Sequence, residues 1–229
     1  SGKTMTVRFP DPPKCGETVI RASGLCKAYG GPTIFEDIDF DLGRGERLLV
    51  LGLNGAGKTS LLRILAGETD ADLGDFDFGY QVHAGYYAQE HDNLRTDQSL
   101  LTNIRDAVPE GINLGETQLR GLLGMFGLSG DKVFQESGTL SGGEKTKLAL
   151  AMLMVGRNNL LLLDEPTNNL DPPSRQAVAD ALVGWPGAII LVSHDEEFVR
   201  ELAPTKVLLM PDGDVDYFSD DWLDLVSMS

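Results

Sequence analysis

The residues from Gly52 to Thr59 have the types and the spacing of a loop that binds phosphate. They match the pattern G-x-x-x-x-G-K-[ST] and read Gly52-Leu53-Asn54-Gly55-Ala56-Gly57-Lys58-Thr59. Glycine lets successive backbone N–H groups point inward around an anion, because it carries no side chain. The Lys58 ammonium would reach the terminal phosphates, and the Thr59 hydroxyl would ligate Mg²⁺. The sequence therefore predicts a phosphate site, which we extend to Ser60.

The flanking residues bear on the alternative that this run is a chance glycine-rich turn. Arg47–Leu51 is a short apolar run, typical of a strand buried on both faces of a parallel sheet. From Lys58 to Ala66 the apolar residues recur at helical spacing. A helix N-terminus at this place would add partial positive charge to the loop. We therefore favour phosphate binding over the chance turn.

Two carboxylates follow a second apolar strand. Leu160–Leu163 is followed directly by Asp164 and Glu165. Ligands of open α/β sheets bind beyond the carboxyl ends of the strands, so Asp164 is expected to hold Mg²⁺. Glu165 is then expected to act on the attacking water as a base or an orienting group. The alternative is a strand that ends in two solvated acids.

His194 follows a third apolar strand and is expected at the same sheet edge. There it would contact a terminal phosphate and help to position the water. The alternative is a surface histidine in a helix-capping turn, because Ser193 and Asp195 flank it. His83 and His91 lack this placement, and we interpret both as surface or packing residues.

Strands and helices are expected to alternate along the chain. Strands or strand-like segments are expected at 19–28, 35–42, 47–51, 75–88, 160–163 and 188–192, helices at 58–66, 99–133 and 141–155, and further helix and strand at 173–182, 196–202, 207–210 and 215–218. This alternation predicts an α/β fold with a mostly parallel sheet. The helical pattern within residues 93–140 predicts an inserted helical lobe.

The run Leu140-Ser141-Gly142-Gly143-Glu144 narrows the class of protein. Physically, a serine cap followed by two glycines makes another helix N-terminus suited to an anion. The alternative is an ordinary capped helix. The run resembles the signature motif of ABC ATPases, and the phosphate loop, a glutamine, the signature, Asp-Glu, Asp and His follow in that family's order. The resemblance covers roughly residues 19–218 and implies an ABC-type P-loop ATPase domain with an antiparallel β subdomain.

The resemblance assigns further roles residue by residue. Tyr29 resembles the aromatic that stacks on adenine, although strand-end packing is an alternative for it. Gln89 is similar to the glutamine that senses Mg²⁺ and water. Asp171 resembles a residue in the loop that contacts the opposite protomer, and a helix N-cap before Pro172 is its alternative. The signature residues Ser141, Gly142, Gly143 and Glu144 would face the ATP of a second ABC domain, so ATP would join two such domains.

Within this superfamily the chain most resembles the second ATPase domain of ABC-F proteins. The run Glu165-Pro166-Thr167-Asn168-Asn169-Leu170-Asp171 is similar to a motif of that branch, which has His at the position of Asn169. The resemblance implies that residues 1–17 end an interdomain linker, and that 18–229 form the ATPase domain. It also implies a cytoplasmic, ribosome-associated factor in translation or antibiotic protection. The alternative is the ATPase subunit of a membrane transporter.

The composition restricts the partners that this chain is expected to bind by itself. Its net charge is −16, so we expect RNA and DNA to repel it, and we assign ribosome contacts to regions outside this chain. No run approaches the roughly 20 apolar residues of a membrane-spanning helix. Cys15 and Cys26 lack the spacing of a metal site, which favours a reduced, cytoplasmic setting. The start at Ser1 is expected to reflect a piece of a longer protein.

Overall fold

The computed structural model describes residues 8–89 and 93–229 of the chain. These residues divide into two compact units, which are described separately. Of the described residues, the sheet unit comprises 13–89, 158–168 and 186–229, and the helical unit comprises 8–12, 93–157 and 169–185. Residues 1–7 of the expected linker and His91 lie outside the described part of the chain.

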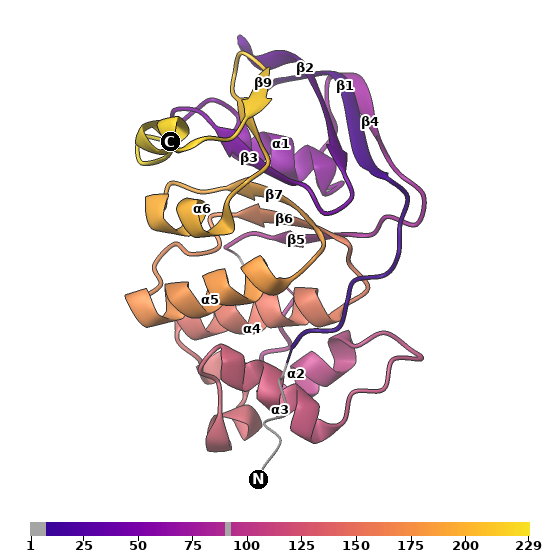
Figure 1. Ribbon diagram of the computed structural model, residues 1–229, viewed down its shortest axis with the longest axis vertical. Coiled ribbons are helices and arrows are strands. Elements are labelled where there is room, and N and C mark those ends of the chain that lie inside the picture. The colour runs from indigo at the N-terminus through magenta and orange to yellow at the C-terminus, as the bar shows by residue number, and fades with distance from the viewer. Residues whose placement is uncertain (1–7, 90–92) are drawn as a thin grey trace. The chain divides into compact units, whose positions relative to one another are not determined.

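The larger sheet of the sheet unit is mostly parallel. In the described residues its strand order is β5-β6-β7-β3-β8-β9 (Figure 1). These strands are β3 (Arg47–Leu51), β5 (Ala84–Tyr87), β6 (Leu160–Asp164), β7 (Ala188–Val192), β8 (Lys206–Leu209) and β9 (Asp214–Tyr217). Only the pairing of β8 with β9 is antiparallel within the described part of this sheet. Apart from Arg47 at the start of β3 and Asp164 at the end of β6, the central strands β3, β6 and β7 are apolar, as is typical of strands buried on both faces.

A second sheet in the same unit is antiparallel. Its described strands are β1 (Thr18–Ala28), β2 (Thr33–Gly43) and β4 (Leu73–Phe78), with β1 in the centre. Along β2, buried Ile38, Phe40 and Leu42 alternate with exposed acids, as expected for a sheet with one wet face. The predicted combination of a mostly parallel sheet and an antiparallel sheet is therefore confirmed.

Helix α1 (Lys58–Leu65) packs in the core that the two sheets share (Figure 1). Its residues Leu61, Leu62, Ile64 and Leu65 are all buried, so the helix is covered on most of its circumference. The cluster that contains them also includes residues of β1, β2, β3, β6 and β7. Burial of this kind stabilises by about 1.5–3 kcal/mol for each large aliphatic side chain. The core thus fixes the start of α1, which directly follows the predicted phosphate loop.

The C-terminal part of the sheet unit adds two helices. Helix α6 (Glu196–Leu202) begins at Asp195, whose side chain accepts a hydrogen bond from the Phe198 N–H. A 3₁₀ turn, η3 (Asp220–Trp222), leads into the short helix α7 (Leu223–Val226), which contacts α6. Asp195 thereby sets the direction of the chain immediately after His194.

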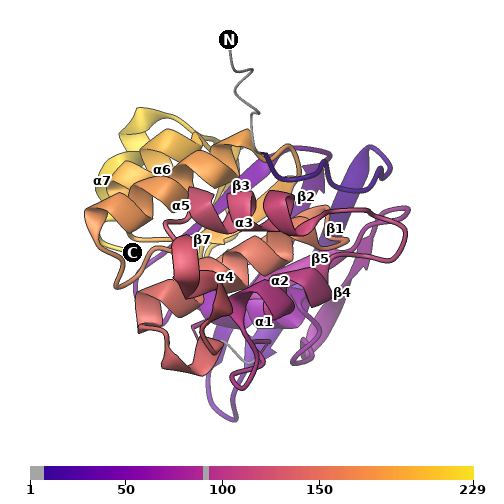
Figure 2. The same ribbon diagram turned by 90° about the horizontal axis from the view of Figure 1, so that it is seen from below.

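The helical unit contains the segment predicted as a lobe together with two longer helices (Figure 2). Its described elements are α2 (Leu100–Ala107), α3 (Glu116–Met125), η1 (Gly130–Phe134), η2 (Ser137–Thr139), α4 (Gly142–Val155) and α5 (Pro172–Gly184). Helix α4 has buried residues along most of its length, including Leu148, Leu150 and Met154. In this unit α2, α3 and α5 all contact α4.

Two expected elements are divided in the structure. The strand-like stretch 75–88 separates into β4 and β5, which belong to different sheets. At Gly79, a Cβ would lie 1.8 Å from the Thr18 carbonyl oxygen, so the chain leaves the antiparallel sheet through a contact that glycine alone allows. The helical stretch 99–133 divides into α2, α3 and η1, because Pro109 and Gly111 interrupt it after Ala107.

Candidate functional site

The carboxyl ends of parallel strands bring the predicted chemistry to one edge of the large sheet. Strand β3 is paired with β7, and β7 with β6, with Val50 opposite Val192 and Val192 opposite Asp164. The loop after β3, the acids at the end of β6 and His194 after β7 therefore leave the sheet at the same edge. Gln89 follows β5, the neighbour of β6, and is exposed.

The loop between β3 and α1 has a backbone that requires glycine. Gly52, Gly55 and Gly57 have φ angles of 154°, 87° and 89°, all in the region that favours glycine. At Gly57 a Cβ would lie 2.6 Å from a ring carbon of Phe35, and at Gly52 it would lie 2.5 Å from the Met210 carbonyl oxygen. The loop is thus in close contact with its surroundings at both ends, at positions that only glycine can occupy without displacing a neighbour.

Lys58 lies between this loop and the acids of β6. It is largely buried, and its Nζ donates to the carbonyl oxygen of Gly52 at 2.5 Å. Burial lowers the pKa of Lys58, and the charges of Glu165 and Asp164 oppose that change. The ammonium therefore links the end of the loop to its first residue, Gly52, and also interacts electrostatically with both carboxylates.

Asp164 is the more enclosed of the two carboxylates. Burial raises its pKa, a hydrogen bond from Thr59 lowers it, and the neighbouring Glu165 raises it again. The hydroxyl of Thr59, the second residue of α1, thus lies at the carboxylate that ends β6. A hydroxyl beside a carboxylate is an oxygen donor set of the kind that Mg²⁺ prefers. No group of three His, Cys, Asp or Glu in the described residues forms a metal site by itself.

Glu165 and His194 face each other. The Nδ1 atom of His194 lies 2.9 Å from Oε2 of Glu165, and the backbone N–H of His194 donates to the same oxygen at 3.3 Å. Glu165 has a φ of 52°, and its N–H donates to the Val192 carbonyl oxygen at 2.8 Å. A non-glycine residue in this conformation is strained, and such strain concentrates at functional sites. The helix after His194 is capped by Asp195, so His194 itself is left for the site.

Tyr29 lies outside the core, with a relative exposure of 57%. Its hydroxyl is 2.9 Å from the hydroxyl of Ser60 on α1, and the buried Lys27 ammonium lies 5.1 Å from the centre of its ring. Lys27 is held in turn by the Asp70 carbonyl oxygen at 2.7 Å. The ring is therefore held in place near α1 with much of its surface open to solvent. The sequence did not predict the roles of Lys27 and Ser60 in holding it.

The predicted signature residues lie in the helical unit at the start of α4. Ser141 caps the helix: its hydroxyl accepts from the Glu144 N–H at 3.2 Å, and its own N–H donates to Glu144 Oε1 at 3.1 Å. Lys132 forms an ion pair with the other oxygen of Glu144 and is the first cause of that residue's lowered pKa. The Glu144 carboxylate is thus engaged within its own unit, whereas Ser141 and Gly142 are exposed.

Asp171 occupies the alternative position that the sequence allowed, the N-cap of α5. It accepts from the Ser174 N–H at 2.8 Å, and hydrogen bonds from Ser174 lower its pKa. Nζ of the buried Lys147 on α4 donates to the Ser174 hydroxyl at 3.1 Å. Gly143 packs against the segment that precedes α5: a Cβ at Gly143 would lie 3.3 Å from a methyl carbon of Leu170. The signature helix and the Asp171 turn are therefore joined inside one unit.

Three features define a P-loop ATPase domain of the ABC type. They are a phosphate loop after the parallel strand β3, two carboxylates at the end of β6 and a glycine-rich helix start at α4. The family model described as ABC transporter matches residues 35–168, which is more than half of the chain. The chain belongs to this family and is one of its ATP-binding, ATP-hydrolysing domains.

Curated relatives cover nearly all of the chain. It is 37% identical over 226 residues to the ATP-binding protein YdiF of Bacillus subtilis strain 168, which covers 95% of the chain and 35% of YdiF. It is 38% identical over 214 residues to the ATP-binding protein YheS of Escherichia coli strain K12, covering 93% of the chain and 33% of YheS. The energy-dependent translational throttle protein EttA of Escherichia coli K12 is 31% identical over 94% of the chain and 39% of EttA. The chain thus spans between a third and two-fifths of these relatives.

Solved structures of ABC proteins share the fold. The ATP-binding cassette MJ0796, solved as a dimer in a post-hydrolysis state with ADP and Pi, matches with a TM-score of 0.69 and 18% identity over 87% of this chain and 99% of that one. A metal-chelate type ABC transporter in an inward-facing conformation matches with a TM-score of 0.69 and 23% identity over 90% and 84%. Across residues 8–89 and 93–229, no helix combines the length and the apolar character needed to cross a membrane.

Proposed function

We propose that this chain is one ATPase domain of an ABC-F-type protein, in which ATP binds between two such domains and is hydrolysed there. The observation that carries the catalytic part is the pairing of Glu165 with His194 at the sheet edge where Asp164 and the phosphate loop also end. A carboxylate beside an imidazole can hold a water molecule and take up its proton. Neither alternative, a solvated acid or a surface histidine, requires this pairing.

In the proposed mechanism, different residues of the sheet unit bind the phosphates, the adenine, the Mg²⁺ ion and the attacking water. The loop from Gly52 to Thr59 and Ser60 binds the phosphates of ATP, Lys58 neutralises the terminal phosphates, and Tyr29 stacks on adenine. Thr59 and Asp164, with Gln89, hold Mg²⁺, which supplies charge neutralisation of the phosphates when it is bound. Glu165 orients the attacking water or accepts its proton, and His194 holds Glu165 and contacts the γ-phosphate. Water adds to the γ-phosphorus as the bond to the β–γ bridging oxygen breaks.

The helical unit serves the nucleotide of a second domain. Ser141, Gly142 and Gly143 present a hydroxyl and backbone N–H groups at a helix N-terminus, which favours an anion. Glu144 keeps Ser141 in place through the capping box, and Asp171 contacts the partner domain. The dimeric state of the structural neighbour MJ0796 supports this arrangement. ATP then binds both domains, and hydrolysis releases them.

The dependence of the hydrolysis rate on protein concentration tests this function. A site completed by a second copy gives an ATPase rate that rises faster than linearly with the concentration of this chain. An ATPase whose site lies wholly within one domain would instead give a hydrolysis rate that is strictly linear in protein concentration. Linearity down to nanomolar protein would contradict the shared site.

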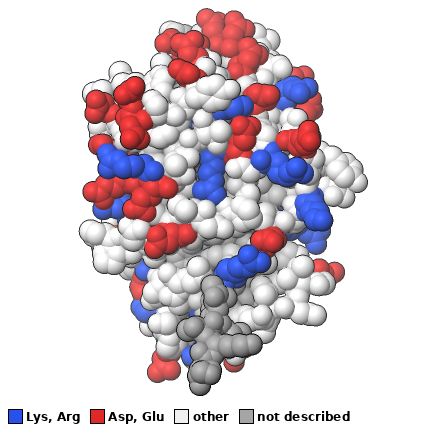
Figure 3. Space-filling model, in the orientation of Figure 1, with Lys and Arg blue, Asp and Glu red and all other residues white. Residues whose placement is uncertain are grey.

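The name of EttA, a translational throttle protein, supports a role in translation for the whole protein. We include a cytoplasmic location and antibiotic protection in the proposal because the sequence motifs resemble those of ABC-F proteins. The charge of this chain, with 35 acidic against 19 basic residues, favours RNA contacts elsewhere. On the face drawn in Figure 3, acidic side chains gather at the end that carries β2 and β9. Co-sedimentation of the full-length protein with ribosomes in ATP tests this role, and absence of binding at low salt would contradict it.

The description of the matched family, ABC transporter, favours a second candidate, the ATPase subunit of a membrane transporter. The sequence preceding residue 1 in the whole protein separates the two. A second phosphate loop and signature in the same chain favour the translation factor. Co-purification of the whole protein with a membrane-spanning partner favours the transporter.

A further inference from the structure

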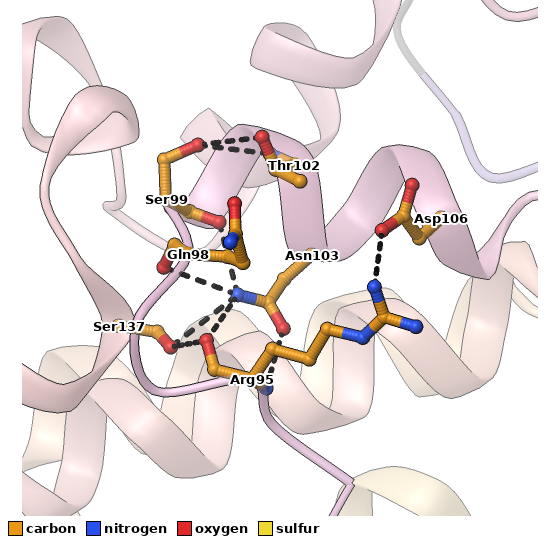
Figure 4. Close-up of polar contacts among 7 residues, drawn as sticks. All are labelled: Arg95, Gln98, Ser99, Thr102, Asn103, Asp106 and Ser137. Atoms are coloured by element: carbon orange, nitrogen blue, oxygen red, sulfur yellow. Dashed lines mark hydrogen bonds and ion pairs between the residues drawn. The ribbon is translucent and has the colours of Figure 1, made fainter.

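The buried side chain of Asn103 joins two segments of the helical unit. It lies on α2 with a relative exposure of 2%, and its amide points at the turn formed by residues 95–99 (Figure 4). Its Oδ1 accepts from the Arg95 N–H at 2.9 Å. Its Nδ2 lies 3.1, 3.3 and 2.9 Å from the backbone oxygens of Arg95, Gln98 and Ser99, which share its two hydrogens as acceptors. The amide thus pairs with backbone polar groups at both ends of this turn.

The same amide also reaches the segment that leads into the signature. Its Nδ2 is 3.3 Å from the hydroxyl of Ser137, which is fully buried and donates to the Arg95 carbonyl oxygen at 2.8 Å. Ser137 begins η2, the turn that precedes Leu140 and Ser141. A side chain of α2 therefore holds the start of the chain segment that ends at the helix cap of α4.

Backbone contacts bring the two segments close together around this amide. The Ser137 N–H donates to Gln98 at 2.8 Å, and the Gly138 N–H donates to Thr96 at 2.9 Å. At Gly138 a Cβ would lie 2.9 Å from the Thr96 carbonyl oxygen. Without the Asn103 side chain, the backbone oxygens of Arg95, Gln98 and Ser99 and the hydroxyl of Ser137 would lose a donor that they share.

We propose that Asn103 is a positioning residue for the signature: through Ser137 it fixes the segment 137–141, so that Ser141 is presented to a partner domain's nucleotide. This inference rests on the proposed function. The capping box of Ser141 and the Lys132–Glu144 pair hold the segment from its other end. Asn103 acts on the partner's nucleotide and not on the chain's own, because the phosphate loop belongs to the sheet unit.

The test compares Asn103→Ala and Ser137→Ala with the control Thr102→Ala, all in a Glu165→Gln background that retains ATP. Thr102 is the neighbouring residue on α2, and its hydroxyl accepts a hydrogen bond from the hydroxyl of Ser99 at 3.0 Å. Ser137→Ala leaves the bonds of Asn103 to the 95–99 turn intact, so it isolates the link between the segments. Circular dichroism establishes that each variant is folded at the temperature used.

Three measurements are made on each variant. Amide hydrogen exchange over residues 137–145 measures how often this segment opens locally. Calorimetry measures ATP affinity, and sedimentation equilibrium measures ATP-dependent self-association. For Asn103→Ala and Ser137→Ala we expect at least about tenfold faster exchange, self-association about fivefold weaker or more, and ATP affinity changed by less than about twofold. The effects of the double variant should be smaller than the sum of those of the two single variants, because both substitutions remove the contact between Asn103 and Ser137.

Unchanged exchange over 137–145 would overturn the inference, and so would faster exchange with self-association equal to that of Thr102→Ala. A parallel fall in the ATP affinity of the monomer, measured below the protein concentration at which the chain self-associates, would also overturn it, because the effect would then be general loss of structure. If the Glu165→Gln parent fails to self-associate in ATP, the proposed shared site fails. The exchange measurement still decides in that case whether Asn103 fixes the segment.

Discussion

The Nδ1 atom of His194 lies 2.9 Å from Oε2 of Glu165. Glu165 directly follows β6, and His194 is the second residue after β7, so this contact links the ends of two neighbouring strands. Because a carboxylate oxygen only accepts hydrogen bonds, the imidazole must donate at Nδ1 when Glu165 is ionised. In the neutral imidazole the opposite nitrogen, Nε2, then accepts a hydrogen bond from water, whereas in the imidazolium it donates to a phosphate oxygen. His194 thus orients Glu165 and contributes a second polar group to the same space.

Replacing Glu165 by Gln should separate ATP binding from hydrolysis. Gln keeps the shape of the side chain but takes up no proton, so we expect turnover to fall by about 100-fold or more. ATP affinity should change by less than about twofold, and the ATP-bound protein should sediment with doubled mass. Glu36→Gln, at an exposed position of β2, serves as control. A variant that stays monomeric in ATP would contradict the role of Glu165.

The two glycines of the phosphate loop with φ near 90° differ in their surroundings, which gives a matched pair of variants. Gly57→Ala places a Cβ 2.6 Å from Phe35, whereas at Gly55 no described atom lies within 4 Å of the added Cβ. Backbone strain alone should lower the free energy of unfolding of Gly55→Ala by about 1–2 kcal/mol. Gly57→Ala should lose clearly more in urea denaturation. Equal losses would show that the contact with Phe35 is relieved without cost.

The ring and the hydroxyl of Tyr29 should have separable effects. Stacking of a base on an aromatic ring contributes about 1–3 kcal/mol, so Tyr29→Ala should weaken ATP binding at least about fivefold. Tyr29→Phe retains the ring and loses only the contact with Ser60, so its ATP affinity should stay within about threefold. Inorganic triphosphate, which has no base, should bind all three proteins alike. Equal loss of triphosphate affinity in Tyr29→Ala would contradict the stacking role.

The ion pair of Lys132 with Glu144 should make stability depend on pH. Lys132 lowers the pKa of Glu144 below its ordinary value of 4.5, so the pair stabilises the folded state above that pH. This contribution is lost as the pH falls through the lowered pKa. Glu144→Gln retains the capping box and loses the pair, so its free energy of unfolding should be lower than wild type by about 0.5 kcal/mol at pH 7.

Urea denaturation from pH 7 to pH 3.5 measures this difference. The gap between wild type and Glu144→Gln should narrow as the pH falls below 4.5, the ordinary value. Glu110→Gln, at an exposed position, should show no such trend. A gap that stays constant over the whole range would contradict the role of the ion pair.

Local patterns in the sequence were sufficient for the features that depend on neighbouring residues. The loop from Gly52 to Thr59 is contiguous, and its flanking strand and helix are strongly periodic, so its position and its glycine geometry followed from the pattern. The Ser141 cap was predicted for the same reason. The gathering of Asp164 and His194 at one edge followed from the rule that parallel strands end together.

Features that depend on distant residues were not predictable from these patterns. The ion pair of Glu144 with Lys132 was not predicted, whereas the assignment of Glu144 to a partner's ATP stays a prediction. The separation of β4 from β5 depends on the approach of Gly79 to Thr18, which no periodicity records. Asn103 reads as an ordinary polar residue of a helix, and only its burial against Ser137 distinguishes it.

The central claim is that the loop after β3 and the Lys58 ammonium together bind a triphosphate. Isothermal calorimetry of ATP binding to Lys58→Ala, with the exposed Lys14→Ala as control, tests it most directly. A lost charge-assisted hydrogen bond corresponds to about 1.5–3 kcal/mol, so we predict that ATP affinity falls by about tenfold or more in Lys58→Ala and is unchanged in Lys14→Ala. A folded Lys58→Ala protein with wild-type ATP affinity would contradict the account.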